Sequence, residues 1–325
     1  MLPDIGSKTL IRQTTMNEII CHNCRAINRW GANFCATCGQ GLIAAVAPGD
    51  EAPTVPGSSL AFLEHGSFEL RIGRRTDTGR MRQTNEDSLL AFDFLCANKS
   101  VSRPVGFFVV ADGMGGHAGG EIASGMLVQA LARRAAEEWL SPAITGQDES
   151  FDREVWLRSA IATGNEEIYE HAREAGIAMG TTVVAAIVEG DRAFIAHVGD
   201  SRAYHLRADD IRRITVDHSL VESLVVARRI SPEEARNHPQ ANVIYRTVGD
   251  SPQVAVDVSR ITLRPGDFLM LCSDGLSGML DDEAIREVVL DASSPQAACD
   301  ALVDAANQAG GEDNCTVILI ELKSS

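Results

Sequence analysis

Residues 109–121 read Val-Val-Ala-Asp-Gly-Met-Gly-Gly-His-Ala-Gly-Gly-Glu, and this stretch decides the fold. The apolar run that leads into it, residues 107–111, is short, β-branched and aromatic, which predicts a buried strand. Asp112 follows at the strand end, and the glycines after it let the backbone turn sharply and approach another group closely. A carboxylate held beside main-chain carbonyls suits a hard divalent cation. For this stretch alone, an ordinary tight turn is the alternative.

Four more carboxylates share this context at predicted strand boundaries: Asp87, Asp200, Asp274 and Asp313. Asp is common in turns, so one such residue means little, but five predict strand ends that converge on one acidic rim. Carboxylates packed together repel one another, and oxygen-only ligands indicate Mg2+ or Mn2+. Two such ions about 4 Å apart can activate a bridging water and clamp a phosphoryl group. Arg82 is placed to grip phosphate oxygens bidentately.

The elements between these carboxylates alternate between strands and helices. Helical spacing of apolar residues predicts helices at 118–140, 156–172, 282–290 and 295–309. Strands are expected at 69–75 (an edge strand), 88–94, 181–188, 192–198, 203–207, 254–263, 267–272 and 315–322, with a hairpin turn at 190–191. Residues 217–239 are charged and contain a capping box at 231–234, which indicates a mobile flap over a site or an ordinary surface excursion.

Composition limits the classes of function. The 325 residues allow one large domain with a small appendage, and 45% of them are hydrophobic, as in a protein with a real core. The net charge of −16 divides into +2 for residues 1–48 and −18 for the remainder. So acidic a body repels phosphate backbones and argues against nucleic acid as the partner. With no apolar run near roughly 18 residues and no signal peptide, we expect a soluble cytoplasmic protein without a membrane partner.

The eight cysteines fall into two classes. Cys21, Cys24, Cys35 and Cys38 form two Cys-x-x-Cys pairs separated by ten residues, a spacing that presents four thiolates to one structural zinc ion. A redox dithiol and free thiols are the alternatives. The segment resembles the small zinc ribbons appended to many bacterial proteins. Cys96, Cys272, Cys299 and Cys315 are scattered in apolar contexts and are expected to be core thiols.

These observations predict four segments: a flexible lead (1–18), a zinc ribbon (19–43), a linker rich in Ala, Pro, Gly and Ser (44–66) and a main domain (67–323). The ribbon is too short to bury a core of its own, so zinc would supply its folding energy. We interpret it as a structural element that makes contacts with other proteins or positions the main domain.

Residues 68–322 resemble the metal-dependent Ser/Thr protein phosphatase family of the protein phosphatase 2C type, in its compact bacterial form. Six motifs carry the resemblance in the family's order: Arg82-x-x-Asn85-Glu86-Asp87, Asp112-Gly113-Met114-Gly115-Gly116, Gly180-Thr181-Thr182, Gly199-Asp200-Ser201-Arg202, Ser273-Asp274-Gly275 and Asp313-Asn314. No single motif would be specific, but six in order across the domain are.

The resemblance implies an α+β fold: a four-layer α-β-β-α sandwich of two antiparallel sheets with the metal site between the sheets' ends. It implies that Mn2+ or Mg2+ is held as a dinuclear centre by Asp87, Asp112, the Gly113 carbonyl, Asp274 and Asp313, with Glu86 bound through water. Asp200 together with Asp274 would hold a weaker third ion, and Arg82 would bind the substrate phosphate. The charged segment 217–239 matches the family's variable flap.

By the same resemblance, the chain is expected to be a monomeric phosphatase acting on phosphoserine and phosphothreonine in proteins that Ser/Thr kinases modify. A bridging hydroxide would attack phosphorus directly, because no Cys or His nucleophile motif is present. Many eukaryotic members have His after the Asp-Gly pair, proposed there as general acid, whereas this chain has Met114. His117 cannot be assumed to substitute, so the general acid is unassigned and a metal-bound water is a candidate.

Two other classes of function are compatible with parts of the sequence. The chain could be a catalytically silent scaffold with a phosphatase fold, but a scaffold should have lost ligand carboxylates, and this chain keeps every position. A zinc-ribbon nucleic-acid binder is disfavoured, because the ribbon carries only Arg25 and Arg29 between its first and last cysteines.

Overall fold

The computed structural model describes residues 18–20, 26–29, 68–98, 101–115, 119–140 and 151–324. The chain divides into two compact units, Met1–Phe62 and Leu63–Ser325. Within the first unit, β1 (Glu18–Ile20) and β2 (Ile27–Arg29) pair antiparallel. The four ribbon cysteines, the linker 44–66 and His117 lie outside the described residues, as does the predicted lead apart from Glu18.

The second unit alternates strands and helices. Its strands are β3 (Phe68–Asp77), β4 (Asp87–Asn98), β5 (Val101–Gly115), β6 (Met179–Thr181), β7 (Val183–Glu189), β8 (Arg192–Val198), β9 (Arg202–Arg207), β10 (Asp210–Arg213), β11 (Asp257–Thr262), β12 (Phe268–Cys272) and β13 (Cys315–Ser324). Its helices are α1 (Gly119–Arg134), the π-helix η1 (Ala135–Leu140), α3 (Arg153–Ala175), α4 (Leu220–Val226), α5 (Pro232–Arg236), α6 (Asp274–Ser277), α7 (Asp282–Asp291) and α8 (Pro295–Gln308). None of these described helices is long and apolar enough to cross a membrane.

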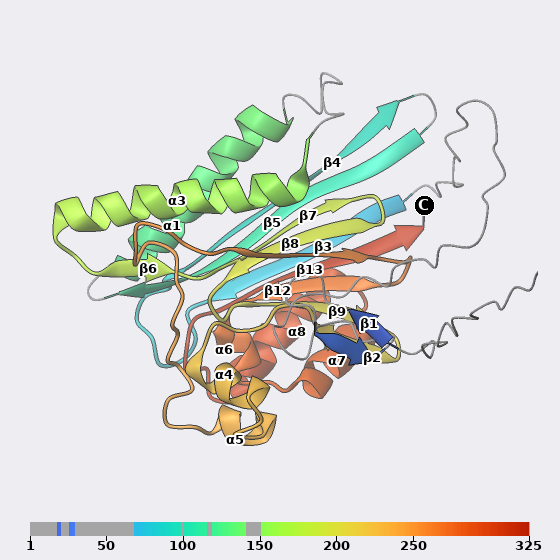
Figure 1. Cartoon of the computed structure of the whole chain (residues 1–325). Helices are drawn as coiled ribbons and strands as arrows, with labels where there is room; N and C mark the ends of the chain where they lie inside the picture. Colours follow the sequence, from blue (N-terminus) through green and yellow to red (C-terminus); the bar gives the residue numbers. More distant parts are fainter. Residues whose placement is uncertain are drawn as a thin grey trace, which may run out of the picture. The chain divides into compact units, whose positions relative to one another are not determined.

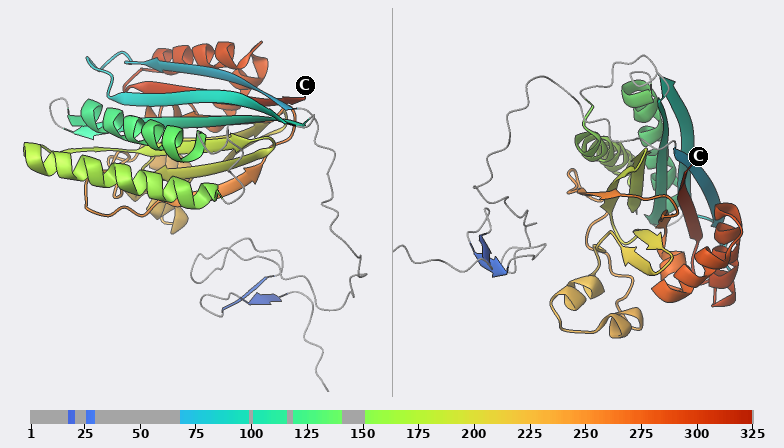
Figure 2. Two further views of the ribbon diagram at one scale, coloured as in Figure 1. Left: turned by 90° about the horizontal axis from the view of Figure 1, so that it is seen from above. Right: turned by 90° about the vertical axis from the view of Figure 1, so that its right-hand side faces the viewer.

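The strands form two antiparallel sheets that pack face to face (Figure 1). One sheet has the order β10-β9-β12-β13-β3, and the other has β11-β8-β7-β5-β4, with β6 added at the end of β5. Helices α1 and α3 cover the outer face of the second sheet, while α7 and α8 cover the outer face of the first (Figure 2). The predicted α-β-β-α sandwich is therefore confirmed, with β3 at a sheet edge as expected.

Strand β5 shows why the stretch at its end is held rigidly. Phe108 and Val110 point into the core between the two sheets, whereas Phe107, Val109 and Ala111 point into the core beneath α1 and α3. All five side chains are fully buried. A strand buried on both faces has no polar alternation, which explains its continuous apolar sequence.

The largest departures from the predicted elements concern helix continuity and short polar strands. The helix expected at 118–140 ends as an α-helix at Arg134 and continues as η1, which carries the fully buried Trp139. Strand β10 was not predicted, because its sequence Asp-Ile-Arg-Arg contains no apolar run. It forms because it pairs with β9 across a tight turn. The hairpin turn at 190–191 is confirmed: β7 and β8 pair around it, and Gly190 has φ +59°.

A buried carboxylate fixes the turn that leads into β12. Asp267 is 4% exposed and accepts hydrogen bonds from His205 Nε2, Arg207 Nε and the Arg264 backbone N–H, each at 2.8 Å. Burial acts to raise the pKa of Asp267, but the hydrogen bonds from Arg207, Arg264 and His205 and the charge of His205 outweigh it and hold the pKa below its usual range.

We expect Asp267→Ala to lower the free energy of unfolding by about 3 kcal/mol at pH 7, because it leaves several buried donors without an acceptor. Since the folded-state pKa is lowered, the contribution of the charge is present above the unfolded pKa and is lost as pH falls through the folded pKa. Urea titrations at pH 7 and pH 4 measure both effects. Asp209→Ala, in the exposed turn between β9 and β10, is the matched control and should change little. An Asp267→Ala loss no larger than that of the control would contradict the assignment.

Candidate metal centre

The predicted carboxylates meet where the ends of the two sheets come together. Asp87 and Asp112 lie opposite each other in the β4–β5 register. Asp274 begins α6 directly after β12, and Asp313 precedes β13, which pairs with β12. Because the sheets pack face to face, these four residues from two sheets reach one place.

Hydrogen bonds and a shared cleft document this convergence. Ser273 Oγ, directly after β12 of the first sheet, donates to Asp87 Oδ2 at 2.8 Å, and Asp112 and Asp274 lie close enough for each carboxyl group to shift the pKa of the other. A cleft of about 390 Å3 opens over the group and is lined in part by Arg82, Glu86, Asp112, Asp274 and Asp313.

The clustered carboxyl groups resist ionisation. Burial, followed by the charges of neighbouring carboxylates, raises the pKa of Asp112 well above its usual range. Burial is also the main cause that raises the pKa of Asp87 to about 7, and the charges of Asp274 and Asp313 raise it further. Hydrogen bonds from Thr316 and Ser273 act in the opposite direction and lower this pKa. Ionised carboxylates this close together need a compensating cation.

Several carboxylate oxygens point at no partner. Asp87 Oδ1, Asp200 Oδ1 and Asp274 Oδ1 are buried without a hydrogen-bond partner among the described residues. Buried acceptors left unpaired in this way are costly unless something else occupies the site. Carboxylate oxygens and a nearby main-chain carbonyl are the donor set that Mg2+ and Mn2+ prefer, so these residues fit such an ion.

Backbone contacts hold Asp112 and Gly113 in place. The backbone N–H of Asp112 donates to Thr182 Oγ1 at 3.1 Å. The Asp112 carbonyl accepts hydrogen bonds from Thr182 N at 2.8 Å and from Thr181 Oγ1 at 2.9 Å. Gly113 N donates to Glu86 O at 3.2 Å. The Gly180-Thr181-Thr182 motif therefore positions Asp112, a role that sequence reasoning had not assigned.

Two glycines let α1 approach this backbone. A Cβ at Gly113 would lie 2.1 Å from Gly120 O, and a Cβ at Gly120 would lie 2.5 Å from Glu86 Oε2. The Glu86 carboxylate thus packs against the first turn of α1, and burial raises its pKa, with Arg82 opposing the shift. Only residues without side chains permit this spacing.

Asn314 organises the loop that carries Arg82. Its Oδ1 accepts from Glu86 N at 2.8 Å, and its Nδ2 donates to the carbonyls of Thr78 and Thr84, each at 2.9 Å. Arg82 Nη2 pairs with Asp313 Oδ2 at 2.6 Å, and half of the Arg82 side chain is exposed in the cleft. Asn314 belongs to a recognised motif, but only the structure reveals its positioning role.

Asp200 lies at the edge of the group, beneath the flap. It is 7% exposed, and burial, followed by the charge of Asp274, raises its pKa. A cavity of about 430 Å3 lies between Asp200, Asp274 and the flap segment, which contains α4 and α5. The predicted capping box at Ser231 and Glu234 is confirmed at the start of α5.

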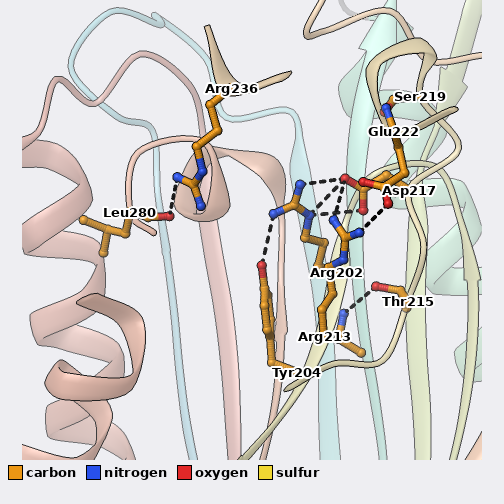
Figure 3. Close-up of polar contacts among 10 residues, drawn as sticks. Arg202, Tyr204, Arg213, Thr215, Asp217, Ser219, Glu222, Arg236 and Leu280 are labelled. Carbon is orange, nitrogen blue, oxygen red and sulfur yellow. Dashed lines mark hydrogen bonds and ion pairs between the residues drawn. The ribbon is translucent and has the colours of Figure 1, made fainter. Parts of the chain in front are cut away.

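The first residue of the flap is anchored by two arginines (Figure 3). Arg202 Nη2 and Arg213 Nη1 reach Asp217 Oδ2 at 2.6 and 3.5 Å, and Arg213 Nη2 also reaches Glu222 Oε1 at 2.5 Å. Farther along, Arg236 donates to the Leu280 carbonyl at 3.4 Å. Two ion pairs thus fix the root of the flap, at Asp217, whereas one long hydrogen bond from Arg236 holds its helix α5.

A separate polar group lies at that root, where His197, His218 and Asp257 bring potential ligand atoms within 4.8 Å of one another. His218 Nδ1 accepts the Gly199 backbone N–H at 3.0 Å, and His218 Nε2 lies 3.2 Å from Asp257 Oδ2 and 2.9 Å from Arg246 Nη1. Both ring nitrogens of His218 therefore already have partners within the protein. We therefore interpret this group as a clamp that holds the start of the flap, at His218, against β8 and β11.

The family model and the relatives that this chain resembles in sequence agree in what they are called. The model of the family described as "Protein phosphatase 2C" matches residues 82–307. The serine/threonine phosphatase stp of Listeria innocua is 40% identical over 249 residues, covering 76% of this chain and 94% of that protein. Protein phosphatase PhpP of Streptococcus pneumoniae is 35% identical over 78% of this chain and 98% of its own length.

The solved structures that resemble this chain agree with the sequence comparisons. The serine/threonine phosphatase PstP/Ppp of Mycobacterium tuberculosis superimposes with a TM-score of 0.66 and 36% identity, over 78% of this chain and 99% of that one. A catalytic domain of PstP in complex with two manganese ions gives a TM-score of 0.65 and 34% identity, over 79% of this chain and all of that one.

Proposed function

This chain belongs to the protein phosphatase 2C family, and we propose that its acidic centre hydrolyses phosphoserine and phosphothreonine esters in proteins. The observation that carries the proposal is the convergence of buried carboxylate oxygens without partners, beside an arginine in an open cleft. The chain is accordingly a metal-dependent protein serine/threonine phosphatase. We expect it to act as a cytoplasmic monomer in signalling, on the products of Ser/Thr kinases.

Residues of this chain would share the binding of two Mn2+ or Mg2+ ions. Asp87, Asp112, the Gly113 carbonyl, Asp274 and Asp313 are the proposed direct ligands. Glu86 would bind through water, and Asp200 would hold a weaker third ion together with Asp274. When bound, two such ions lower the pKa of water and neutralise charge on the phosphoryl group.

Arg82 is the proposed phosphate-binding residue. Its ion pair with Asp313 uses Nη2 and orients the guanidinium, which leaves other N–H groups to bind phosphate oxygens in the cleft. The loop that carries Arg82 is fixed by Asn314, so the charge is held in position before substrate arrives. Such preorganisation stabilises the charge of the transition state.

Direct attack of water on phosphorus is favoured over a phosphocysteine intermediate. Burial raises the pKa of Cys272 and of Cys299 to about 12, and it raises the pKa of Cys315 further. These thiols are therefore protonated at neutral pH and are poor nucleophiles. Met114, which lines the cleft, offers no proton to the leaving alkoxide.

Turnover of a phosphothreonine peptide should depend on added metal. We expect Mn2+ to support hydrolysis and excess EDTA to lower the rate by at least about 100-fold, since several kcal/mol of charge stabilisation are lost. Excess Mn2+ added afterwards should restore the rate, and circular dichroism serves as the control for folding. Equal turnover in EDTA would contradict the proposal. No turnover with either Mn2+ or Mg2+ in folded protein would favour the scaffold function.

We further propose that Cys21, Cys24, Cys35 and Cys38 hold one structural zinc ion, on the basis of their spacing. Elemental analysis should find about one zinc per chain, and the double variant Cys21→Ser/Cys24→Ser should lose it. Phosphopeptide turnover with Mn2+ should persist in this variant, because its cysteines precede the phosphatase domain. Retention of zinc would contradict the proposed ligand set. We propose that the ribbon contacts proteins and does not bind nucleic acid, so a titration of the chain with nucleic acid at low salt should show no binding.

A further inference from the structure

A second pocket adjoins the cleft of the acidic centre. It has a volume of about 380 Å3 and lies between the C-terminal end of α3, the strand β6 and residues 247–250. Figure 1 shows α3 leading directly into β6. Met114 and Gly115, at the end of β5, line both this pocket and the cleft. We refer to it as the α3 pocket; it shares these two residues with the cleft where the phosphate would react.

One segment forms a wall of both hollows. Residues 242–244 line the cleft, while Thr247, Gly249 and Asp250 line the α3 pocket. Thr247 lies three positions after Ile244, and three extended residues span at most about 10 Å. A polypeptide lying along this wall with its phosphate in the cleft would therefore bring a side chain two or three residues away to the α3 pocket.

The lining of the α3 pocket suits an apolar side chain. Met114, Tyr169, Ile177 and Met179 contribute apolar surface, and Ile177 is 39% exposed. Val243, on the shared wall at the cleft, is 44% exposed. Exposed apolar groups gathered around a polar reaction site are typical of a surface that binds another molecule.

The polar groups at this pocket are available to a ligand. Within the described parts of the chain, the side chains of Tyr169, Arg173 and Asp250 make no hydrogen bond or ion pair. A bound peptide would therefore break no internal ion pair, and these groups can hydrogen-bond its backbone. Gly180 adds no side chain to the floor of the pocket; a Cβ there would lie 3.2 Å from Val248 O, a tight contact.

We propose that the α3 pocket is a substrate subsite that binds an apolar side chain two or three residues from the phosphorylated Ser or Thr. The inference rests on the proposed function, because it assumes a phosphoryl group in the cleft. It adds a selectivity that the acidic centre cannot provide, since that centre contacts only the phosphate and the reacting atoms. A small aryl phosphate would occupy the cleft alone.

The test compares phosphothreonine peptides that carry either Leu or Ala at the second and third positions on each side. For the wild-type full chain with Mn2+, we expect kcat/KM to favour the Leu peptide at one or more of these positions by about tenfold, the effect of burying one such side chain. Ile177→Glu should reduce this ratio to near one. Val155→Glu, at the other end of α3 and 61% exposed, is the matched control and should keep the ratio.

A second variant, Ala172→Phe, fills the pocket and should also remove the preference, so the result does not depend on one substitution that fails to fold. Turnover of p-nitrophenyl phosphate by each variant reports an intact acidic centre. Equal rates of the wild type on all peptides, or an unchanged Leu preference in both pocket variants, would overturn the subsite. Absence of p-nitrophenyl phosphate turnover in the wild type would instead count against the proposed function.

Discussion

Asp274→Asn is expected to lower phosphopeptide hydrolysis by about 10³-fold or more, the effect of losing several kcal/mol of metal-based stabilisation. Asp274 is half-buried, lies beside the Asp112 carboxyl group and has one buried oxygen without a partner among the described residues. As the proposed ligand of two ion sites, it has more influence on metal binding than a carboxylate that serves one. The rate is measured with Mn2+ on a phosphothreonine peptide.

The same substitution should not destabilise the metal-free fold. Burial, then the charge of Asp313, raises the pKa of Asp274, so the ionised side chain opposes folding at neutral pH. A neutral amide removes that charge, and we expect the melting temperature without metal to be at or above that of the wild type. The stabilisation that Mn2+ gives the wild type should be lost, because fewer ligands bind the ion.

Asp291→Asn, at the exposed C-terminal end of α7, is the matched control and should retain both activity and the response to Mn2+. Full activity in folded Asp274→Asn would contradict the proposed ligand set while leaving the family assignment intact. A large loss of stability without metal would show instead that Asp274 has a structural role.

Gly113→Ala is expected to lower activity by about 100-fold and the free energy of unfolding by up to about 3 kcal/mol. The added Cβ would lie 2.1 Å from Gly120 O and 2.6 Å from Glu86 O, and both are backbone atoms. The end of β5 must therefore move by about 1 Å from α1 and from the loop at Glu86. That movement displaces the Gly113 carbonyl and the adjacent Asp112.

Gly125→Ala provides the comparison, because its Cβ meets nothing within 4 Å and Gly125 lies inside α1. Alanine is the better helix former, so this variant should be more stable than the wild type by up to about 1 kcal/mol, with unchanged activity. Chemical denaturation and peptide hydrolysis on the two variants measure the contrast. Wild-type activity in Gly113→Ala would show that the backbone at this position tolerates displacement.

Sequence by itself determined most of the strands and helices and the candidate carboxylates of this protein, and the resemblance carried by its six motifs implied the layered fold. Residues 107–111 are continuously apolar because β5 is buried on both faces, and this pattern predicts a buried strand from the sequence alone. Asp112, Asp274 and Asp313 each combine a charged side chain with a strand boundary, a local pattern that needs no contact information. The capping box of α5 and the turn at 190–191 are likewise local, since their hydrogen bonds join near neighbours.

Only the tertiary structure decided which residues support those carboxylates and what surrounds them. Thr182 contacts Asp112, which is 70 positions away in the sequence, and Asn314 contacts Glu86, which is 228 positions away. Polar side chains of this kind follow no periodicity that would predict such partners. Strand β10 and the α3 pocket arise in the same way, from pairing and from the packing of α3 against β6. Local sequence reports burial and backbone preference, whereas contacts between distant segments depend on the packed sheets that bring them together.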